Sequence, residues 1–333
     1  MRLPAEWEQQ EFVQLVFPHE NTDWHEYLDD AINTFAAIAK AIQKYQKVLI
    51  VSKNLTHIKT LFPKKKNLTF INIDSDDTWS RDFGGITIEH DGQLLIEDFS
   101  FNAWGKKFEY EKDNQITRKL KLKGLFKGYS HKTIPFVLEV GAIESNGEGI
   151  IMTTSECLLE KNRNPKLTQK QIEKKLIQYL GAKKVLWLNH GALAGDDTDS
   201  HIDTLARFID TDTIMYQTCD DTNDSHYEEL KKMEEELKNF RQLNGKPFKL
   251  IALPWIKAKW DEEDRLPATY ANFLIINGAV LVPTYQDKND NEALKIFKKA
   301  FPKRDIIGID CSTLIRQHGS LHCVTMQYPK LKA

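Results

Sequence analysis

The sequence lacks the features that mark membrane, secreted and nucleic-acid-binding proteins. None of its apolar runs approaches the roughly 18 residues of a membrane span, so we expect no contact with a membrane. The acidic opening segment, MRLPAEWEQQEF, has no apolar core and does not resemble a secretory signal. The 333 residues carry 46 basic and 48 acidic side chains, a formal net charge of −2, which gives no bulk attraction for nucleic acid.

Cysteine is also scarce. The four cysteines, Cys157, Cys219, Cys311 and Cys323, are far apart and form no CxxC pair, which argues against a structural zinc site or a disulfide framework. The lysine cluster Lys64–Lys66 has no aromatic residues interleaved with it, so we interpret it as a solvated face. These absences predict a reduced, cytoplasmic protein that binds neither nucleic acid nor membrane.

Hydrophobic spacing predicts helices and strands that alternate along the chain. Helices are expected at 26–45, 55–62, 169–180, 224–242 and 290–301. Strands are expected at 47–52, 68–73, 184–189, 202–209, 213–218, 305–310 and after Cys323, and hairpins around Asp91-Gly92, Asn146-Gly147 and Asn277-Gly278. Thr168 and Gln171 have the spacing of a capping box, and Gly181 is expected to end that helix.

The lysine-rich stretch 105–132 is the only candidate insertion, and we interpret it as a long surface loop. No low-complexity linker divides the chain. We therefore expect a single α/β domain over residues 1–333, built from repeated units of hairpin and helix.

Four aspartates and one histidine lie within the thirteen residues 196–208, DDTDSHIDTLARF. A solvated acidic loop, a divalent-metal site and an acid-base site all remain open for this segment. If it is a strand, His201 and Asp203 share one face, which suits proton transfer beside a bound cation.

A second acidic segment, DSDDTWSRDFGG at 74–85, gathers four aspartates around Trp79 and Arg81. Arg81 and Asp82 could form a structural ion pair. Two acidic loops at the mouths of strands would instead form a strongly negative pocket, which requires a cation. The cation could be a metal or an organic group, and a planar guanidinium matches carboxylates by paired hydrogen bonds.

Cys323 lies in HGSLHCVTMQYP (318–329), after a glycine-containing turn and at the start of an expected strand. Sulfur at a strand end can be exposed and activated as a nucleophile, although a lone cysteine is often an inert core residue. We assign the inert role to Cys157, Cys219 and Cys311, which lie within or beside apolar segments.

Together these motifs resemble the agmatine deiminase / bacterial-type peptidylarginine deiminase family of guanidine-modifying enzymes, over nearly the whole chain. The matching segments are LPAEWE, DDTWSRDFGG, LEVGAIESNGEGIIMTTSECLLEKNRNP, DDTDSHIDTLARF, PATYANFLIINGAVLVPTYQDKND and GSLHCVT. The resemblance implies the pentein fold, a five-bladed pseudo-symmetric α/β propeller of repeated ββαβ units.

The resemblance also implies residue roles. Cys323 would attack the guanidinium carbon, and Asp82 and Asp203 would clamp the guanidinium nitrogens. His201 would protonate the departing ammonia and then activate water against the S-alkylthiouronium intermediate. Glu139 matches a family carboxylate near the same group. A guanidinium is a poor electrophile, and ammonia is a poor leaving group. Catalysis therefore requires that the cation be oriented, that a thiolate attack it and that a proton be delivered.

The substrate implied is a small guanidinium compound, with agmatine first and free or peptide-linked arginine as the alternative. Asp197 could meet the far amine of agmatine, Trp79 could flank its methylene chain, and Glu6 is a weaker candidate contact. No metal or organic cofactor is expected, and a homo-oligomer is left open. A metal-dependent hydrolase and a catalytically inactive polyamine-binding protein are the alternatives from other classes.

Four positions depart from the family pattern. Val140 replaces a glycine, Glu144-Ser145 replaces a histidine and an apolar residue, and Ser200 replaces a glycine before His201. Gln317-His318 stands where further glycines are usual. The proposed chemistry is compatible with all four changes, but they can alter the shape of the pocket.

Overall fold

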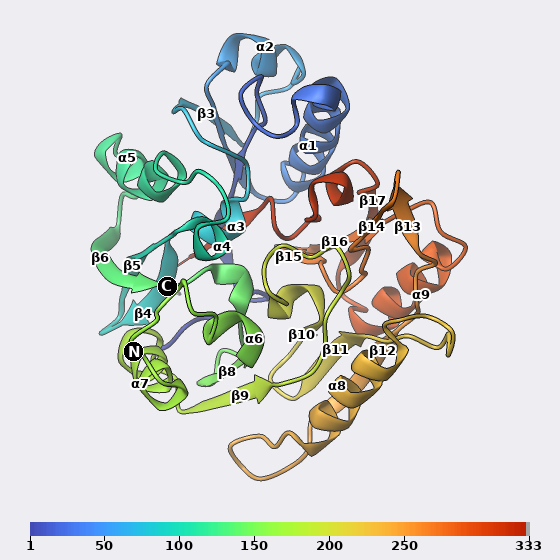
Figure 1. Ribbon diagram of the computed structural model, residues 1–333. Coiled ribbons are helices and arrows are strands. Elements are labelled where there is room, and N and C mark those ends of the chain that lie inside the picture. Colours follow the sequence, from blue (N-terminus) through green and yellow to red (C-terminus); the bar gives the residue numbers. More distant parts are fainter. Residues whose placement is uncertain (331–333) are drawn as a thin grey trace.

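The computed structural model describes residues 1–330 as small mixed sheets with helices packed around them (Figure 1). The sheets are β18 (Met326–Pro329), β1 (Gln10–Val16), β2 (Lys47–Ser52) and β3 (Leu68–Asn72); β4 (Ile86–His90), β5 (Gln93–Ser100) and β6 (Tyr129–Val137); β7 (Ile143–Ser145), β8 (Ile150–Thr154) and β9 (Lys184–Leu188); β10 (Ala206–Phe208), β11 (Thr213–Gln217) and β12 (Lys249–Leu253); β15 (Leu274–Ile276), β16 (Ala279–Thr284) and β17 (Asp305–Asp310); and the hairpin β13 (Lys259–Asp261) and β14 (Asp264–Leu266).

The helices connect these strands and cover their faces. They are α1 (Leu28–Ile42), α2 (Leu55–Thr60), α3 (Ser80–Phe83), α4 (Ala103–Lys106), α5 (Ile116–Leu122), α6 (Ser155–Leu158), α7 (Gln169–Leu180), α8 (Tyr227–Asn239) and α9 (Asp290–Ala300). Short 3-10 turns occur at His25–Tyr27, Asp113–Gln115, Val140–Ala142, Ile202–Thr204 and Leu314–Gln317. Among the described residues, no helix is long and apolar enough to cross a membrane.

Five sheets repeat one order of strands. In each, an antiparallel pair is followed by a parallel strand: β18-β1-β2, β4-β5-β6, β7-β8-β9, β10-β11-β12 and β15-β16-β17. The parallel strand always follows a helical crossover, as parallel pairing requires. Apolar faces of these sheets and helices form a large core and a smaller one around β9–β12 and α8.

Local sequence signals account for many of these elements. Around α7, the capping box of Thr168 and Gln171 is present, and Gly181 ends the helix in the left-handed conformation with φ 68°. The hairpins predicted at Asp91-Gly92, Asn146-Gly147 and Asn277-Gly278 are confirmed as β4-β5, β7-β8 and β15-β16. Glycine tolerates the positive φ that the helix end and such turns require.

Two secondary-structure predictions are wrong. The stretch 105–132 is not a long loop, because α5 lies within it and buries Ile116 and Leu120 one turn apart while its lysines face outward. The segment 202–209 is not one strand: a 3-10 turn at Ile202–Thr204 precedes the short β10. His201 and Asp203 therefore do not owe their placement to strand alternation.

The connections between consecutive sheets carry the candidate site residues. Asp82 lies between β3 and β4, Gly141 between β6 and β7, and His201 between β9 and β10. Asn272 precedes β15, and Cys323 precedes β18. Figure 1 places α3 and the chain leading to β18 near the middle of the molecule.

Candidate active site

One pocket, with a volume of about 170 Å³, contains the cysteine that the sequence singled out. Its lining is acidic (Asp23, Asp77, Asp82, Asp197), aromatic (Trp79, Trp104, Phe108) and otherwise formed by Thr198, Gln317, His318, Gly319 and Cys323. Among the described residues that line it there is no lysine and no arginine. The pocket is therefore suited to an elongated cation with apolar walls along its stem.

Cys323 lies in the turn before β18 and is only 4% exposed. Its Sγ donates to Asn272 Oδ1 at 3.4 Å, and the same amide oxygen accepts from the backbone N–H of His322 at 2.8 Å. Burial, together with Asp203 and Asp82, raises the pKa of the thiol well above its ordinary value. A thiolate at neutral pH therefore requires a positive charge nearby.

Asp82, which lies within α3, is buried and receives only neutral donors. Its Oδ2 accepts from Trp104 Nε1 at 2.9 Å and its Oδ1 from the backbone N–H of Gly141 at 3.1 Å. Burial raises its pKa well above the ordinary value, and the charges of Asp203 and Glu139 add to the effect. An ionised Asp82 therefore also requires a cation.

Three predicted residues converge over Gly141. A β-carbon at that glycine would lie 2.6 Å from His201 Nδ1, 2.8 Å from Asp82 Oδ1 and 3.2 Å from Asp203 Oδ2. His201 Nδ1 is itself 3.6 Å from Asp82 Oδ1. Glycine is the residue that allows the backbone and three polar groups to approach this closely.

His201 is placed by its local loop. Its backbone N–H donates to Thr198 Oγ1 at 3.1 Å, and its carbonyl accepts from Thr204 Oγ1 at 2.8 Å. Burial lowers the pKa of the imidazole to about 4, so it is neutral at pH 7 before a ligand binds. Among the described residues, His201 Nε2 and Asp203 Oδ1 are buried atoms without a hydrogen-bond partner.

Glu139 is fully buried and paired with a cation. Both of its oxygens accept from Arg163 Nε at 3.0 Å, and Arg163 also contacts Asp199 at 2.7 Å. Among the described residues, Glu139, Cys157 and His201 form a group whose ligand atoms lie within 4.8 Å of one another, a spacing that a metal ion could bridge. Because Arg163 already neutralises Glu139, charge balance does not call for a metal here.

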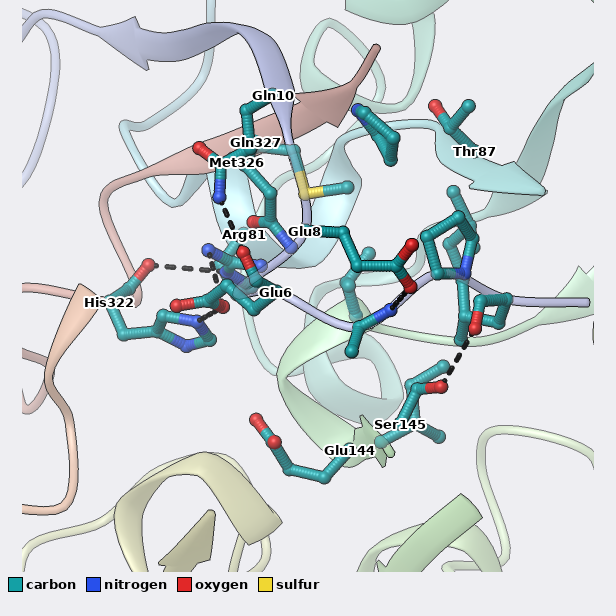
Figure 2. A pocket seen from close by; sticks show the side chains of 17 residues that line it. Glu6, Glu8, Gln10, Arg81, Thr87, Glu144, Ser145, His322, Met326 and Gln327 are labelled. Carbon is teal, nitrogen blue, oxygen red and sulfur yellow. Dashed lines mark hydrogen bonds and ion pairs between the residues drawn. The ribbon is translucent and has the colours of Figure 1, made fainter. Parts of the chain in front are cut away.

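A second network of buried charges includes residues that line a small cavity of about 50 Å³ (Figure 2). His322 Nδ1 lies 2.7 Å from Asp203 Oδ2, and its Nε2 lies 2.7 Å from Glu6 Oε2. Glu6 also accepts from Arg207 Nη2 at 2.9 Å and faces Arg81 at 3.8 Å. Burial opposes the charge of Glu6, but Arg207 and His322 hold its pKa below the usual range.

This network also places two residues left open by the sequence. Arg81 does not pair with Asp82, because its Nε donates instead to the His322 carbonyl at 3.3 Å. Glu6 lies in the network rather than in the pocket. Glu144, a departure from the family pattern, is paired with Arg207, so its carboxylate serves the same network.

The pocket also contains Asp197 and Trp79, as candidate substrate contacts. Trp79 packs closely on Gly319, where any side chain would clash with the indole, and donates from Nε1 to Asp77 Oδ2 at 2.8 Å. The carbonyl of Asp197 accepts from Lys107 Nζ at 2.6 Å. Asp196 stabilises the loop by accepting from Thr198 Oγ1 at 2.6 Å.

Two other departures lie in left-handed backbone beside the pocket. Ser200 has φ 62°, and its hydroxyl donates to Glu156 at 2.8 Å. His318 also has φ 62°, and its Nδ1 lies 2.7 Å from the Gly195 carbonyl. A side chain at such a φ carries a conformational cost, and in both cases a polar contact offsets it.

Sequence reasoning missed several pocket and supporting residues: Asp23, Asp77, Trp104, Phe108, Arg163, Asn272 and His322. Asp77 could have been singled out because it lies in DSDDTW, and His322 because it precedes Cys323. Nothing local marked Trp104 or Arg163, since their partners are 22 and 24 residues away in the chain.

The comparisons with known proteins agree with this fold. The family model described as Porphyromonas-type peptidyl-arginine deiminase matches residues 2–329. The agmatine deiminase of Pseudomonas aeruginosa (strain LESB58) is 32% identical over 353 residues, which cover 98% of this chain and 95% of the relative. A structure of C. jejuni agmatine deiminase with a cysteine-to-serine substitution and bound substrate is 45% identical, with a TM-score of 0.94, and covers 99% of this chain and 96% of that one.

Two further structures bear on specificity and on fold. A Porphyromonas gingivalis protein assigned provisionally as an arginine deiminase is 50% identical, with a TM-score of 0.95 and 98% coverage of each chain. DDAH from Pseudomonas aeruginosa, at 13% identity and a TM-score of 0.51, covers 96% of this chain and 100% of its own and shares the fold alone.

The repeated mixed sheets and the likeness to DDAH give the chain a pentein-type fold. Within that class, the chain belongs to the Porphyromonas-type peptidyl-arginine deiminase family.

The convergence over Gly141 gives a first prediction. Gly141→Ala is expected to lower deiminase activity at least about 100-fold, because its methyl group would displace His201, Asp82 or Asp203, and misplacement by about 1 Å is enough for such a loss. Gly308→Ala in β17, whose β-carbon would approach Thr284 Cγ2 at 3.3 Å, is the matched control and should retain activity. Full activity of Gly141→Ala would contradict the convergence.

The buried network gives a second prediction, on stability. Glu6→Gln is expected to lower the free energy of unfolding at pH 7 by roughly 3–5 kcal/mol, because Arg207 and His322 lose a buried partner. The pKa of Glu6 is lowered on folding, so its contribution is complete above the unfolded value of 4.5 and declines as the pH falls below it. Urea unfolding at pH 7 and pH 3.5 should show the difference shrinking in acid.

The control for Glu6 is Glu11→Gln, which removes a surface ion pair with Lys47. Its effect should be below about 1 kcal/mol at either pH. A Glu6 effect equally small, or one unchanged between the two pH values, would show that Glu6 does not stabilise the protein as an ionised group.

Proposed function

We propose that the protein hydrolyses agmatine to N-carbamoylputrescine and ammonia through a covalent intermediate on Cys323. The observation that carries the proposal is the composition of the pocket: four aspartates, three aromatic side chains, a cysteine, and no lysine or arginine among the described residues that line it. Agmatine has a cation at each end and an apolar stem between them, which complements such a lining.

In the proposed reaction, Asp82 and Asp203 hold the guanidinium nitrogens and the thiolate of Cys323 attacks the guanidinium carbon. A C–S bond forms, and the C–N bond to one terminal nitrogen breaks as His201 supplies the proton that releases ammonia. His201 then takes a proton from water, whose oxygen adds to the S-alkylthiouronium carbon. The C–S bond breaks, leaving the ureido product and the thiolate.

The protonation states of the free protein support a reaction that begins only when substrate binds. The thiol pKa is raised by burial, Asp203 and Asp82, and the His201 pKa is lowered by burial. Both groups are therefore neutral at rest. An arriving guanidinium stabilises Asp82 as a carboxylate and Cys323 as a thiolate, so the thiol proton can pass to His201.

Arginine is the alternative substrate for the same chemistry. Free arginine would bring a carboxylate toward Asp77, Asp197 and Asp23, and among the described lining residues no lysine or arginine would receive it. The Pseudomonas aeruginosa and C. jejuni relatives are agmatine deiminases, which also favours agmatine. The C. jejuni structure holds its substrate with a cysteine replaced by serine, which supports a role for cysteine.

The proposal includes the finer architecture. We place Glu139 beside His201 as a carboxylate that orients it, and Asp197 and Trp79 along the remainder of the substrate. The five sheets of one strand order support a five-bladed propeller of ββαβ units and one catalytic domain over 1–333. The chemistry requires a small guanidinium substrate and no cofactor. We also propose that the protein is cytoplasmic.

The central test is turnover. Wild-type protein should release ammonia from agmatine with kcat/KM at least about tenfold above that for free arginine or a C-terminal arginyl peptide. Acid quench during turnover should trap a covalent adduct on Cys323, detected by mass spectrometry, and Cys323→Ser should abolish both signals. A chelator should leave the rate unchanged, whereas thiol alkylation should stop it.

Other outcomes discriminate among the alternatives. Turnover of arginine or the peptide but not of agmatine would reassign the substrate. Loss of activity with a chelator and tolerance of alkylation would indicate a metal-dependent hydrolase, and agmatine binding without turnover would indicate a polyamine-binding protein.

Asp77 predicts a pH dependence of substrate affinity. Burial and the neighbouring Asp23 raise its pKa to about 7, although Trp79 and Trp24 donate to it. Its carboxylate becomes ionised as the pH rises through 7, so KM for agmatine should fall between pH 6 and pH 8. In Asp77→Asn that fall should be reduced, and an identical KM profile in the variant would remove Asp77 from substrate binding.

A further inference from the structure

Trp104 stands out because it is the only side chain, among the described residues, that donates a hydrogen bond to Asp82. Its Nε1 lies 2.9 Å from Asp82 Oδ2, and the backbone N–H of Gly141 lies 3.1 Å from Oδ1. One neutral donor on each oxygen fixes the plane of the carboxylate. It also stabilises the ionised form, which burial disfavours.

The backbone that carries Trp104 is unusual. The four residues of α4 all have positive φ: Ala103 49°, Trp104 52°, Gly105 86° and Lys106 68°. They form a left-handed turn, closed by the hydrogen bond from Lys106 N to the Asn102 carbonyl at 2.7 Å. L-residues other than glycine rarely adopt this conformation, and consecutive ones are rarer still.

Several contacts hold this turn in place. Asn102 Oδ1 accepts from the Gly105 N–H at 3.1 Å, and Asn102 Nδ2 donates to the Asn162 carbonyl at 3.0 Å. Lys107 Nζ donates to the Asp197 carbonyl and pairs with Asp199 at 2.8 Å. Strained backbone that its surroundings over-determine in this way is typical of functional sites.

The ring of Trp104 is fixed as firmly as its backbone. It packs edge-on against Phe101 at 5.3 Å, Phe108 at 5.7 Å and Trp79 at 6.4 Å between ring centroids, and it lines the pocket beside Cys323. The indole N–H is therefore directed at Asp82 by both packing and backbone.

We infer that Trp104 is a positioning residue for the proposed deimination: its indole N–H sets the orientation of Asp82 toward the substrate guanidinium. The inference rests on the proposed function and extends it to a residue in the strained turn. A purely structural role would require only the ring of Trp104. The positioning role requires the N–H as well.

The consequence for pH dependence follows from the charges around Asp82. Asp203 and His201 face it from the connection before β10, Glu139 from the connection before β7, and Cys323 from the connection before β18. The two anionic neighbours, Asp203 and Glu139, raise its pKa, whereas Trp104 lowers it. Removing the indole N–H therefore raises the pKa of Asp82 further, so Asp82 ionises only at higher pH.

The experiment compares Trp104→Phe with wild type in agmatine turnover from pH 5 to pH 9. We expect kcat/KM to fall about 10- to 100-fold, the range for losing a hydrogen bond to a charged group. Its acid limb should move upward by about one pH unit. The matched control is Trp187→Phe, which removes an indole donor to Glu173 (2.7 Å) outside the pocket and should change neither quantity.

A second variant separates the N–H from the ring. Replacing Trp104 by 3-benzothienylalanine keeps the bicyclic shape and removes the donor, so packing is retained even if Trp104→Phe unfolds. The inference requires this variant to show the same loss and the same shift of the acid limb. Activity within about twofold of wild type, with an unchanged acid limb, would overturn it.

A readout independent of turnover distinguishes this inference from the proposed function. Alkylation of Cys323 by iodoacetamide, followed by peptide mapping, should be faster in Trp104→Phe than in wild type at pH values where only the wild-type Asp82 is ionised. A neutral Asp82 repels the thiolate less. If wild type turns over no guanidine, the proposed function fails, whereas identical alkylation profiles would overturn the role of Trp104.

Discussion

The constraint on which the site depends is the cost of burying several carboxylates around one thiol. An isolated charge in a protein interior is unfavourable by several kcal/mol or more, so each buried acid requires a partner. Glu139 has the cationic partner Arg163, Asp203 has a hydrogen-bonded imidazole in His322, and Asp82 has only neutral donors. An ionised Asp82 therefore lacks a compensating positive charge in the free protein, and in the proposed reaction the substrate guanidinium supplies it.

The same constraint explains why the supporting residues come from distant parts of the chain. Arg207 and His322 both contact Glu6, which Figure 2 shows beside His322 and Arg81, and His322 in turn contacts Asp203. Such networks are costly when incomplete, because removing one partner leaves the others buried and unpaired. The connections between sheets supply Asp82, Glu139, Asp203 and His322, whereas Arg207 lies in β10 and Arg163 in the β8–β9 crossover, so the fold and the site depend on each other.

The sequence predicted much of the fold because its signals are local. The hairpins at Asp91-Gly92, Asn146-Gly147 and Asn277-Gly278 and the capping box of α7 are each specified within a few residues. The strand predicted at 202–209 is wrong because alternating apolar residues indicate a strand, whereas a 3-10 turn begins the segment. That turn also brings His201 and Asp203 close to Gly141. Gly141, Arg163 and Trp104 could not be found, since their roles depend on contacts between separate connections.

Near the pocket, several residues adopt backbone conformations that cost conformational free energy but place their side chains for specific contacts. Trp104, Ser200 and His318 all have positive φ, and all lie in or beside the connections that form the pocket. Glycine would remove the cost at each position but would also remove a polar contact that joins neighbouring loops. Since catalysis by orientation tolerates displacements of less than about 1 Å, loops fixed by both strain and side-chain contacts serve it better than relaxed ones. In the proposed reaction, the left-handed residues would thus help the loops around the pocket to hold one cation against one sulfur.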